Sequence, residues 1–116
     1  FCVAGTTDHI TPWEACYRSA LLLGGKCEFV LSNSGHIQSI LNPPGNPKAT
    51  YFENGKLTSD PRAWYYDAQK QEGSWWPQWL EWIQQRSGEQ RETVFALGSN
   101  KYPAMEASPG TYVHMR

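Results

Sequence analysis

The sequence predicts an α/β fold in which two neighbouring parallel strands are joined by a crossover helix. Residues 1–5 and residues 27–31 form short apolar runs typical of strands, and the second run lacks the alternation of a half-exposed strand. Between them, Thr11 and Glu14 frame a strong helix start, with Thr11 as N-cap and Glu14 at the third helical position of a capping box. A strand, a helix and a strand in this order favour a parallel pair.

The first helix is expected over residues 12–23, because apolar side chains recur at the spacing of one helical face. Two glycines, Gly24 and Gly25, then end it. The side chains expected on the buried face are those of Trp13, Cys16, Tyr17, Ala20 and Leu21.

Turn-forming residues divide the rest of the chain. Residues 42–47 contain three prolines and must form a loop. Residues 51–57 carry an Asn-Gly pair and predict a small hairpin. A second helix is expected from a cap at Asp60 to about Gln71, and a third after Ser74. The inward stripe of that third helix is expected to comprise Trp76, Trp79, Leu80 and Ile83.

Composition narrows the classes of function. The formal net charge is −1, so neither nucleic acid nor an anionic membrane is expected as a partner. No apolar run approaches the ~20 residues of a membrane span. The three cysteines are odd in number and lack C-x-x-C spacing, which argues against a disulfide framework or a structural zinc site and fits a reducing cytoplasm. No metal site is predicted.

Asp8 and His36 are the candidate catalytic residues. Each follows a predicted strand, so both belong at the carboxyl edge of one parallel sheet, in the chain order of the acid and base of a nucleophile–acid–base triad. No nucleophile elbow occurs in residues 1–116, and the chain begins abruptly without Met. We therefore expect a fragment, the end of a catalytic domain whose nucleophile-bearing part is absent.

Simpler interpretations remain open for the same residues. Asp8 could bond backbone N–H groups near Thr11, and His36 could be a polar loop residue or the cap of a short helix over residues 37–41. His9 could line an active-site cavity or be a solvated loop residue. The tryptophans of residues 64–82 are expected in the core rather than on a binding platform, and the cysteines are expected to be buried small hydrophobes.

Four ordered segments resemble the polyhydroxyalkanoate (PHA) synthases. Residues 5–13 resemble the family's acid loop and residues 34–44 its histidine segment, while residues 73–79 and 107–113 resemble later parts of its C-terminal region. The likeness covers essentially the whole chain. It is greatest to the Pseudomonas-type synthases of class II, which use medium-chain-length substrates.

The resemblance implies that residues 1–116 are the C-terminal part of an α/β-hydrolase-type catalytic domain. Such enzymes polymerise (R)-3-hydroxyacyl-CoA into polyester and release CoA through a Cys–His–Asp triad; the CoA thioester is the substrate and no cofactor is needed. By the match, Asp8 would be the acid, which in the family is also thought to help activate the hydroxyl, and His36 the base. His9 is the candidate substrate-binding residue, with a solvated position as the open alternative. None of the three cysteines, Cys2, Cys16 and Cys27, lies in a Gly-x-Cys-x-Gly elbow, so this chain alone should be inactive.

The resemblance further implies a homodimer that works in the cytoplasm at the surface of polyester granules, with the growing polyester chain as a partner. Two other functions remain open: an esterase or depolymerase of the α/β-hydrolase type with a Ser nucleophile, and a non-catalytic, aromatic-rich interaction module. The module requires independent folding. We expect residues 1–116 alone to aggregate or stay partly disordered, since two parallel strands and one helix leave sheet edges uncovered.

Overall fold

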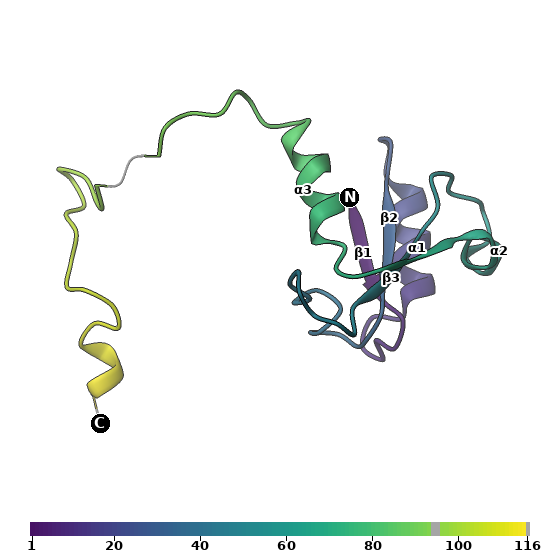
Figure 1. The fold of residues 1–116 in the computed structure, drawn as a ribbon, viewed down its shortest axis with the longest axis horizontal. Coiled ribbons are helices and arrows are strands. Elements are labelled where there is room, and N and C mark those ends of the chain that lie inside the picture. Colours follow the sequence, from purple (N-terminus) through teal and green to yellow (C-terminus); the bar gives the residue numbers. More distant parts are fainter. Residues whose placement is uncertain (94–95, 116) are drawn as a thin grey trace.

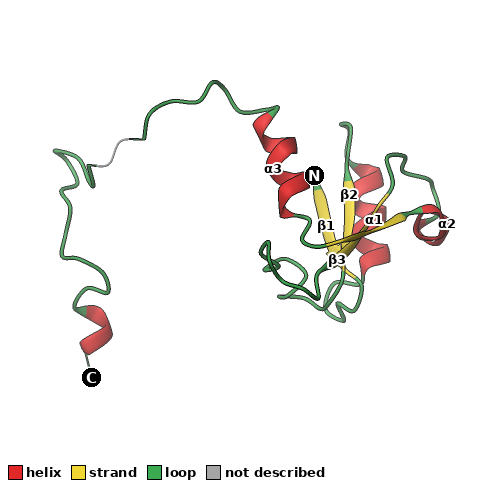
Figure 2. Ribbon diagram, in the orientation of Figure 1, coloured by secondary structure: helices red, strands yellow, loops and turns green. Residues whose placement is uncertain are grey.

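The computed structural model describes residues 1–93 and 96–115 as a mixed α/β fold with a four-stranded sheet in the order β1-β2-β3-β4. Figure 1 shows the elements and Figure 2 their type. In chain order they are β1 (Cys2–Gly5), α1 (Trp13–Leu22), β2 (Phe29–Ser32), β3 (Thr50–Glu53), α2 (Pro61–Asp67), β4 (Gln69–Glu72), α3 (Trp76–Gln84) and the short 3-10 helix η1 (Tyr112–His114).

The predicted parallel pair is confirmed. β1 and β2 are parallel, with Gly5 opposite Ser32 at their carboxyl ends, and α1 is the crossover between them. All four residues of β2 are buried, which explains its continuous apolar character. In Figure 1, α1 and α3 lie on opposite sides of these two strands. Of the two helices, α1 packs against both strands.

Aromatic side chains dominate the core on the α1 side. The rings of Tyr17, Phe29 and Trp64 contact one another, with centroids 5.0 to 5.3 Å apart. The Tyr17 hydroxyl donates to the Thr58 carbonyl and accepts from the Thr58 N–H, each at 2.9 Å. Offset and edge-to-face pairs of this kind add about 0.5–1.5 kcal/mol each beyond their buried area. The core thereby joins α1, β2 and α2.

The strands β3 and β4 differ from what the sequence predicted. Residues 51–57 do not form a hairpin, because β3 pairs antiparallel with β2 on one side and β4 on the other. The second helix starts as predicted, with Asp60 accepting from the Arg62 N–H at 3.0 Å, but ends at Asp67. The strand β4 that follows is polar and mostly exposed, as is common for an edge strand, so its sequence carries little apolar signal.

The helix predictions need further corrections. Thr11 does not cap α1, whose N-cap position is Pro12 without a side-chain bond. Leu21 is exposed rather than buried. No residue of α3 is fully buried. Its predicted inward stripe is wrong for Trp79 and Leu80, which are exposed, whereas Trp76 and Ile83 are partly buried. Of the tryptophans, Trp64 and Trp75 are the buried ones among the described residues.

The cysteines are less buried than predicted, and the C-terminal segment is exposed. All three cysteines are free and only partly buried. After α3 the chain extends away from the sheet, ending in η1, whose residues are exposed (Figure 1). Across residues 1–93 and 96–115, no helix combines the length and the apolar character that crossing a membrane requires.

Candidate active site

Asp8 and His36 lie in direct contact. The Nδ1 atom of His36 is 2.8 Å from Oδ2 of Asp8. The two residues follow the carboxyl ends of β1 and β2, which pair in parallel and therefore open on the same edge of the sheet. Binding and catalytic groups of α/β proteins gather at this edge. The predicted convergence of the two side chains is thus present in the structure.

Local hydrogen bonds hold the Asp8 carboxylate. Its Oδ1 atom accepts from the N–H groups of Ile10 and Thr11, at 2.9 and 3.0 Å, and its Oδ2 atom accepts from the Thr11 hydroxyl at 2.7 Å. The simpler interpretation of Asp8 as a backbone acceptor is therefore realised together with the His36 contact. Four donors keep the carboxylate in place.

These donors also determine the charge of Asp8. The backbone N–H of Thr11 lowers the pKa of the Asp8 carboxyl most, and the Thr11 hydroxyl, His36 and the Ile10 N–H add to the effect against partial burial, so that this pKa lies well below its ordinary value of 3.8. Asp8 is consequently an anion at neutral pH. A carboxylate can only accept, so Nδ1 of His36 carries a proton; in the neutral imidazole the lone pair is then on Nε2.

The pair is shielded on one side only. The Asp8 side chain is 6% exposed and that of His36 is 46% exposed. A buried acid behind an accessible imidazole is the arrangement of an acid–base pair, since the acid orients the ring and the ring meets the substrate. Within residues 1–93 and 96–115 the second nitrogen, Nε2, has no hydrogen-bond partner, so it is the atom that can exchange a proton with a substrate.

Gly5 is a residue of this site that sequence reasoning missed. A Cβ at Gly5 would lie 2.7 Å from the Ser34 carbonyl oxygen and 2.8 Å from the Ser39 hydroxyl. Only a glycine lets the loop after β2 approach the end of β1 this closely. The sequence offers one signal for this close approach, which is that small residues recur around both loops.

A small cavity of about 140 Å³ lies at the pair and is lined by Asp8, His36, Ser39 and Cys16, among others. Cys16 lies within α1, and its thiol donates to the Thr11 carbonyl at 3.7 Å. His9 is exposed and is absent from this lining. Its contact with substrate stays a prediction.

The other two cysteines lie away from the pair. The Sγ atoms of Cys2 and Cys27 are 3.5 Å apart, at the start of β1 and just before β2. Burial raises the pKa of the Cys27 thiol, and the neighbouring Cys2 adds to the effect. A raised pKa reduces the thiolate fraction, so neither geometry nor charge favours a nucleophile here.

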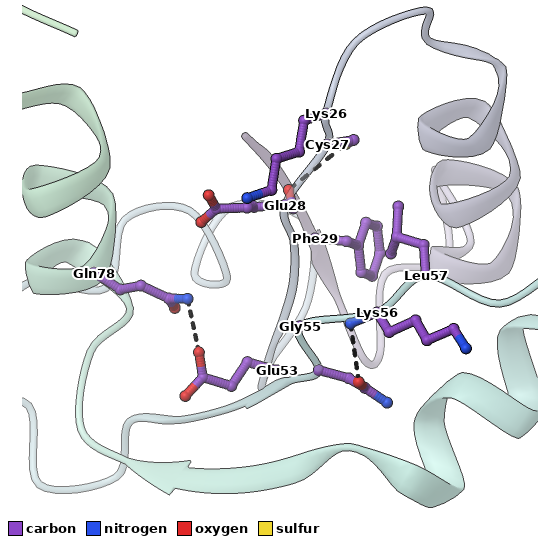
Figure 3. A pocket seen from close by; sticks show the side chains of 10 residues that line it. Lys26, Cys27, Glu28, Phe29, Glu53, Gly55, Lys56, Leu57 and Gln78 are labelled. Atoms are coloured by element: carbon purple, nitrogen blue, oxygen red, sulfur yellow. Dashed lines mark hydrogen bonds between the residues drawn. The ribbon is translucent and has the colours of Figure 1, made fainter. Parts of the chain in front are cut away.

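A larger cavity occupies the opposite end of the sheet. It measures about 450 Å³ and includes Glu28 and Phe29 at the beginning of β2. Figure 3 shows Gln78 of α3 pointing toward Glu53, to which it donates at 2.7 Å. Catalytic groups of this kind of fold belong at the carboxyl ends of parallel strands. The larger volume of this cavity therefore does not make it the candidate active site. Within the described ranges, no group of three or more His, Cys, Asp or Glu side chains could hold a metal ion.

Comparison with known proteins identifies relatives over the full length of the chain. The chain is 65% identical over 116 residues to poly(3-hydroxyalkanoate) polymerase 2 of Ectopseudomonas oleovorans and 59% identical over 116 residues to polymerase 1 of the same organism. These 116 residues cover 21% of the length of each polymerase. The chain is also 42% identical over 106 residues to the poly(3-hydroxyalkanoate) polymerase subunit PhaC of Cupriavidus necator, which is 91% of this chain and 18% of the relative. No family model matches.

The chain thus spans about a fifth of the length of these relatives. The chain is more similar to the two Ectopseudomonas polymerases than to the Cupriavidus subunit. This agrees with the predicted resemblance to the Pseudomonas-type synthases. Residues 1–116 are therefore similar throughout to the C-terminal part of the Pseudomonas-type polyhydroxyalkanoate synthases, which confirms the resemblance predicted from four segments.

Proposed function

We propose that Asp8 and His36 are the acid and the base of a Cys–His–Asp triad in a polymerase that joins (R)-3-hydroxyacyl groups from CoA thioesters into polyester. The observation that carries this proposal is the 2.8 Å contact between His36 Nδ1 and Asp8 Oδ2. The similarity to polymerases over all 116 residues supports the reaction class. The nucleophile would be a cysteine outside residues 1–116.

The geometry suits both half-reactions. In the first, His36 Nε2 takes the thiol proton, the thiolate attacks the thioester carbonyl, and CoA leaves as the thiol after recovering that proton. In the second, Nε2 takes the proton of a 3-hydroxyl group, whose oxygen attacks the acyl-enzyme and releases the cysteine. Asp8 remains ionised throughout and stabilises the imidazolium.

The wider context follows the same proposal. The parallel pair with its crossover helix would be the end of an α/β-hydrolase-type domain, completed by strands outside this chain. The whole enzyme would be a cytoplasmic homodimer at polyester granules. Supporting this, several large apolar side chains near His36 are exposed in residues 1–116 and require a cover or an apolar product. They are Ile10, Ile37, Ile40 and Leu41.

The test is a hybrid polymerase, in which residues 1–116 replace the matching segment of polymerase 2 of E. oleovorans. The hybrid should release CoA and form polymer, whereas residues 1–116 alone should do neither. His36→Gln and Asp8→Asn should each reduce CoA release by about 10²–10⁴-fold. His114→Gln, at an exposed position of η1, serves as the matched control. Full activity of the His36 variant would refute the proposal, and hydrolysis without polymer would indicate an esterase.

A further inference from the structure

The turn that carries His36 is held by three consecutive side chains far along the sequence. The Trp75 indole N–H donates to the Ser39 carbonyl at 2.8 Å, and the Trp76 indole N–H donates to the Ile40 carbonyl at 3.0 Å. The Ser74 hydroxyl donates to the Asn42 carbonyl. We call residues 74–76 the clamp. It fixes the backbone just after His36 from the start of α3.

Ser39 links the clamp to the histidine. Its N–H donates to the Gly35 carbonyl at 2.9 Å, closing a turn around His36. The Ile37 carbonyl then accepts from the N–H groups of Ile40 and Leu41, at 3.1 and 2.9 Å. Ser39 is 1% exposed. A shift of its carbonyl would therefore be passed directly to the turn and to the imidazole.

The clamp residue with the best-protected bond is Trp75. Its side chain is buried and stacks against Phe1, with ring centroids 6.0 Å apart, whereas the Trp76 bond is exposed. A hydrogen bond away from water is stronger than one in contact with it. The turn also lies close to Gly5 at the end of β1, since a Cβ added there would be within 3 Å of Ser34 and Ser39. The turn is thus confined between β1 and the Trp75 indole.

We propose that Trp75 is a positioning residue that holds His36 against Asp8 through the Ser39 carbonyl. This inference rests on the proposed function, since the positioned group is the proposed base. A displacement of about 1 Å in a reacting group can cost on the order of 10²-fold in rate. Among the hydrogen bonds of the described residues, the Trp75 indole binds the Ser39 carbonyl and not the side chain of Asp8 or His36.

Trp75→Phe in the hybrid polymerase tests the proposal, because phenylalanine keeps a ring in the site but removes the N–H. We expect kcat to fall by about 10- to 100-fold with KM changed less than about threefold, since the base is misplaced and substrate contacts are kept. Trp64→Phe is the matched control: Trp64 is also buried, but its N–H has no partner among the described residues. It should lose stability without a comparable loss of kcat.

Hydrogen exchange provides a readout independent of activity. In Trp75→Phe, the Ser39 and Leu41 amides should exchange at least about tenfold faster than in the parent, and in Trp64→Phe they should not. Ser74→Ala, a milder change, should act in the same direction. Unchanged exchange in Trp75→Phe, or a kcat loss equal to that of Trp64→Phe, would overturn the proposal. An inactive parent hybrid would instead refute the proposed function, while exchange would still test the clamp.

Discussion

The two loops that form the candidate site are built in opposite ways. The acid loop, residues 6–12, is stabilised by its own neighbours, since Asp8 accepts from Ile10 and Thr11, two and three residues away. The histidine loop, residues 33–49, is instead held by Trp75 and Trp76, each 36 residues from its acceptor. One loop carries its conformation in adjacent residues. The other combines its own local bonds with long-range bonds from Trp75 and Trp76, at the start of α3.

This difference has a consequence for robustness. Local bonds form wherever the short segment is intact, whereas long-range bonds exist only when the sheet and α3 are assembled. The acid should therefore stay ordered under conditions that loosen the histidine. Changes to the two loops can test this contrast separately.

Apart from changes to Asp8 and His36 themselves, the largest effect is expected at Gly5, where the two loops meet. Gly5→Ala places a methyl group within 3 Å of Ser34 and Ser39, which forces the histidine loop away from β1. Overpacking of this kind typically costs about 1–3 kcal/mol, and the displaced base should cost on the order of 10² in rate. CoA release and thermal unfolding of the hybrid measure both. Unaltered activity would mean that the close approach is not needed.

A smaller effect is expected in the acid loop. Thr11→Val keeps the shape of the side chain and the backbone donor but removes the hydroxyl bond to Asp8 Oδ2. Because three of the four donors remain, the rate should fall only about five- to tenfold, the equivalent of one ordinary hydrogen bond. Kinetics of the hybrid test this. A loss as large as that of Asp8→Asn would show that the loop is less robust than its local bonds indicate.

The pH dependence sharpens the description of Asp8. Its pKa is lowered mainly by the Thr11 N–H. As the pH falls, Asp8 of the unfolded chain therefore binds a proton at a higher pH than Asp8 of the folded chain does. This carboxylate therefore stabilises the fold above about pH 4, and the contribution disappears as the pH falls through the lowered pKa. The difference in unfolding midpoint between the parent hybrid and Asp8→Asn should stay constant at neutral pH. A difference that already shrinks above about pH 5 would contradict the lowered pKa.

The smallest effect is expected at the Ser39 side chain. Its hydroxyl is buried and has no hydrogen-bond partner among the described residues, in contrast to its carbonyl, which binds Trp75. Ser39→Ala should therefore leave activity within about twofold and unfolding stability within about 1 kcal/mol. A strong loss of activity would reassign the Ser39 contribution from the backbone to the side chain.

Prediction from sequence succeeded for some elements with a strong local signal and failed where pairing over long range or a competing local bond decided the structure. The apolar runs of β1 and β2 and the Asp60 cap each depend on adjacent residues, and all three are present in the structure. Most of β4 lies within the range predicted for the second helix, which was expected to run to about Gln71. Its strand conformation comes from pairing with β3. The Thr11 cap failed because Asp8 takes the Thr11 hydroxyl instead.

By itself, the sequence determined that an acid and an imidazole follow two strands joined by one helix, and the resemblance assigned them a chemistry. Only the tertiary structure decided that the two groups touch, that the acid is an anion held by four donors, and that a distant indole confines the turn bearing His36. The physical reason is range: backbone propensity acts over a few residues, whereas distances between loops are decided by packing of the whole sheet.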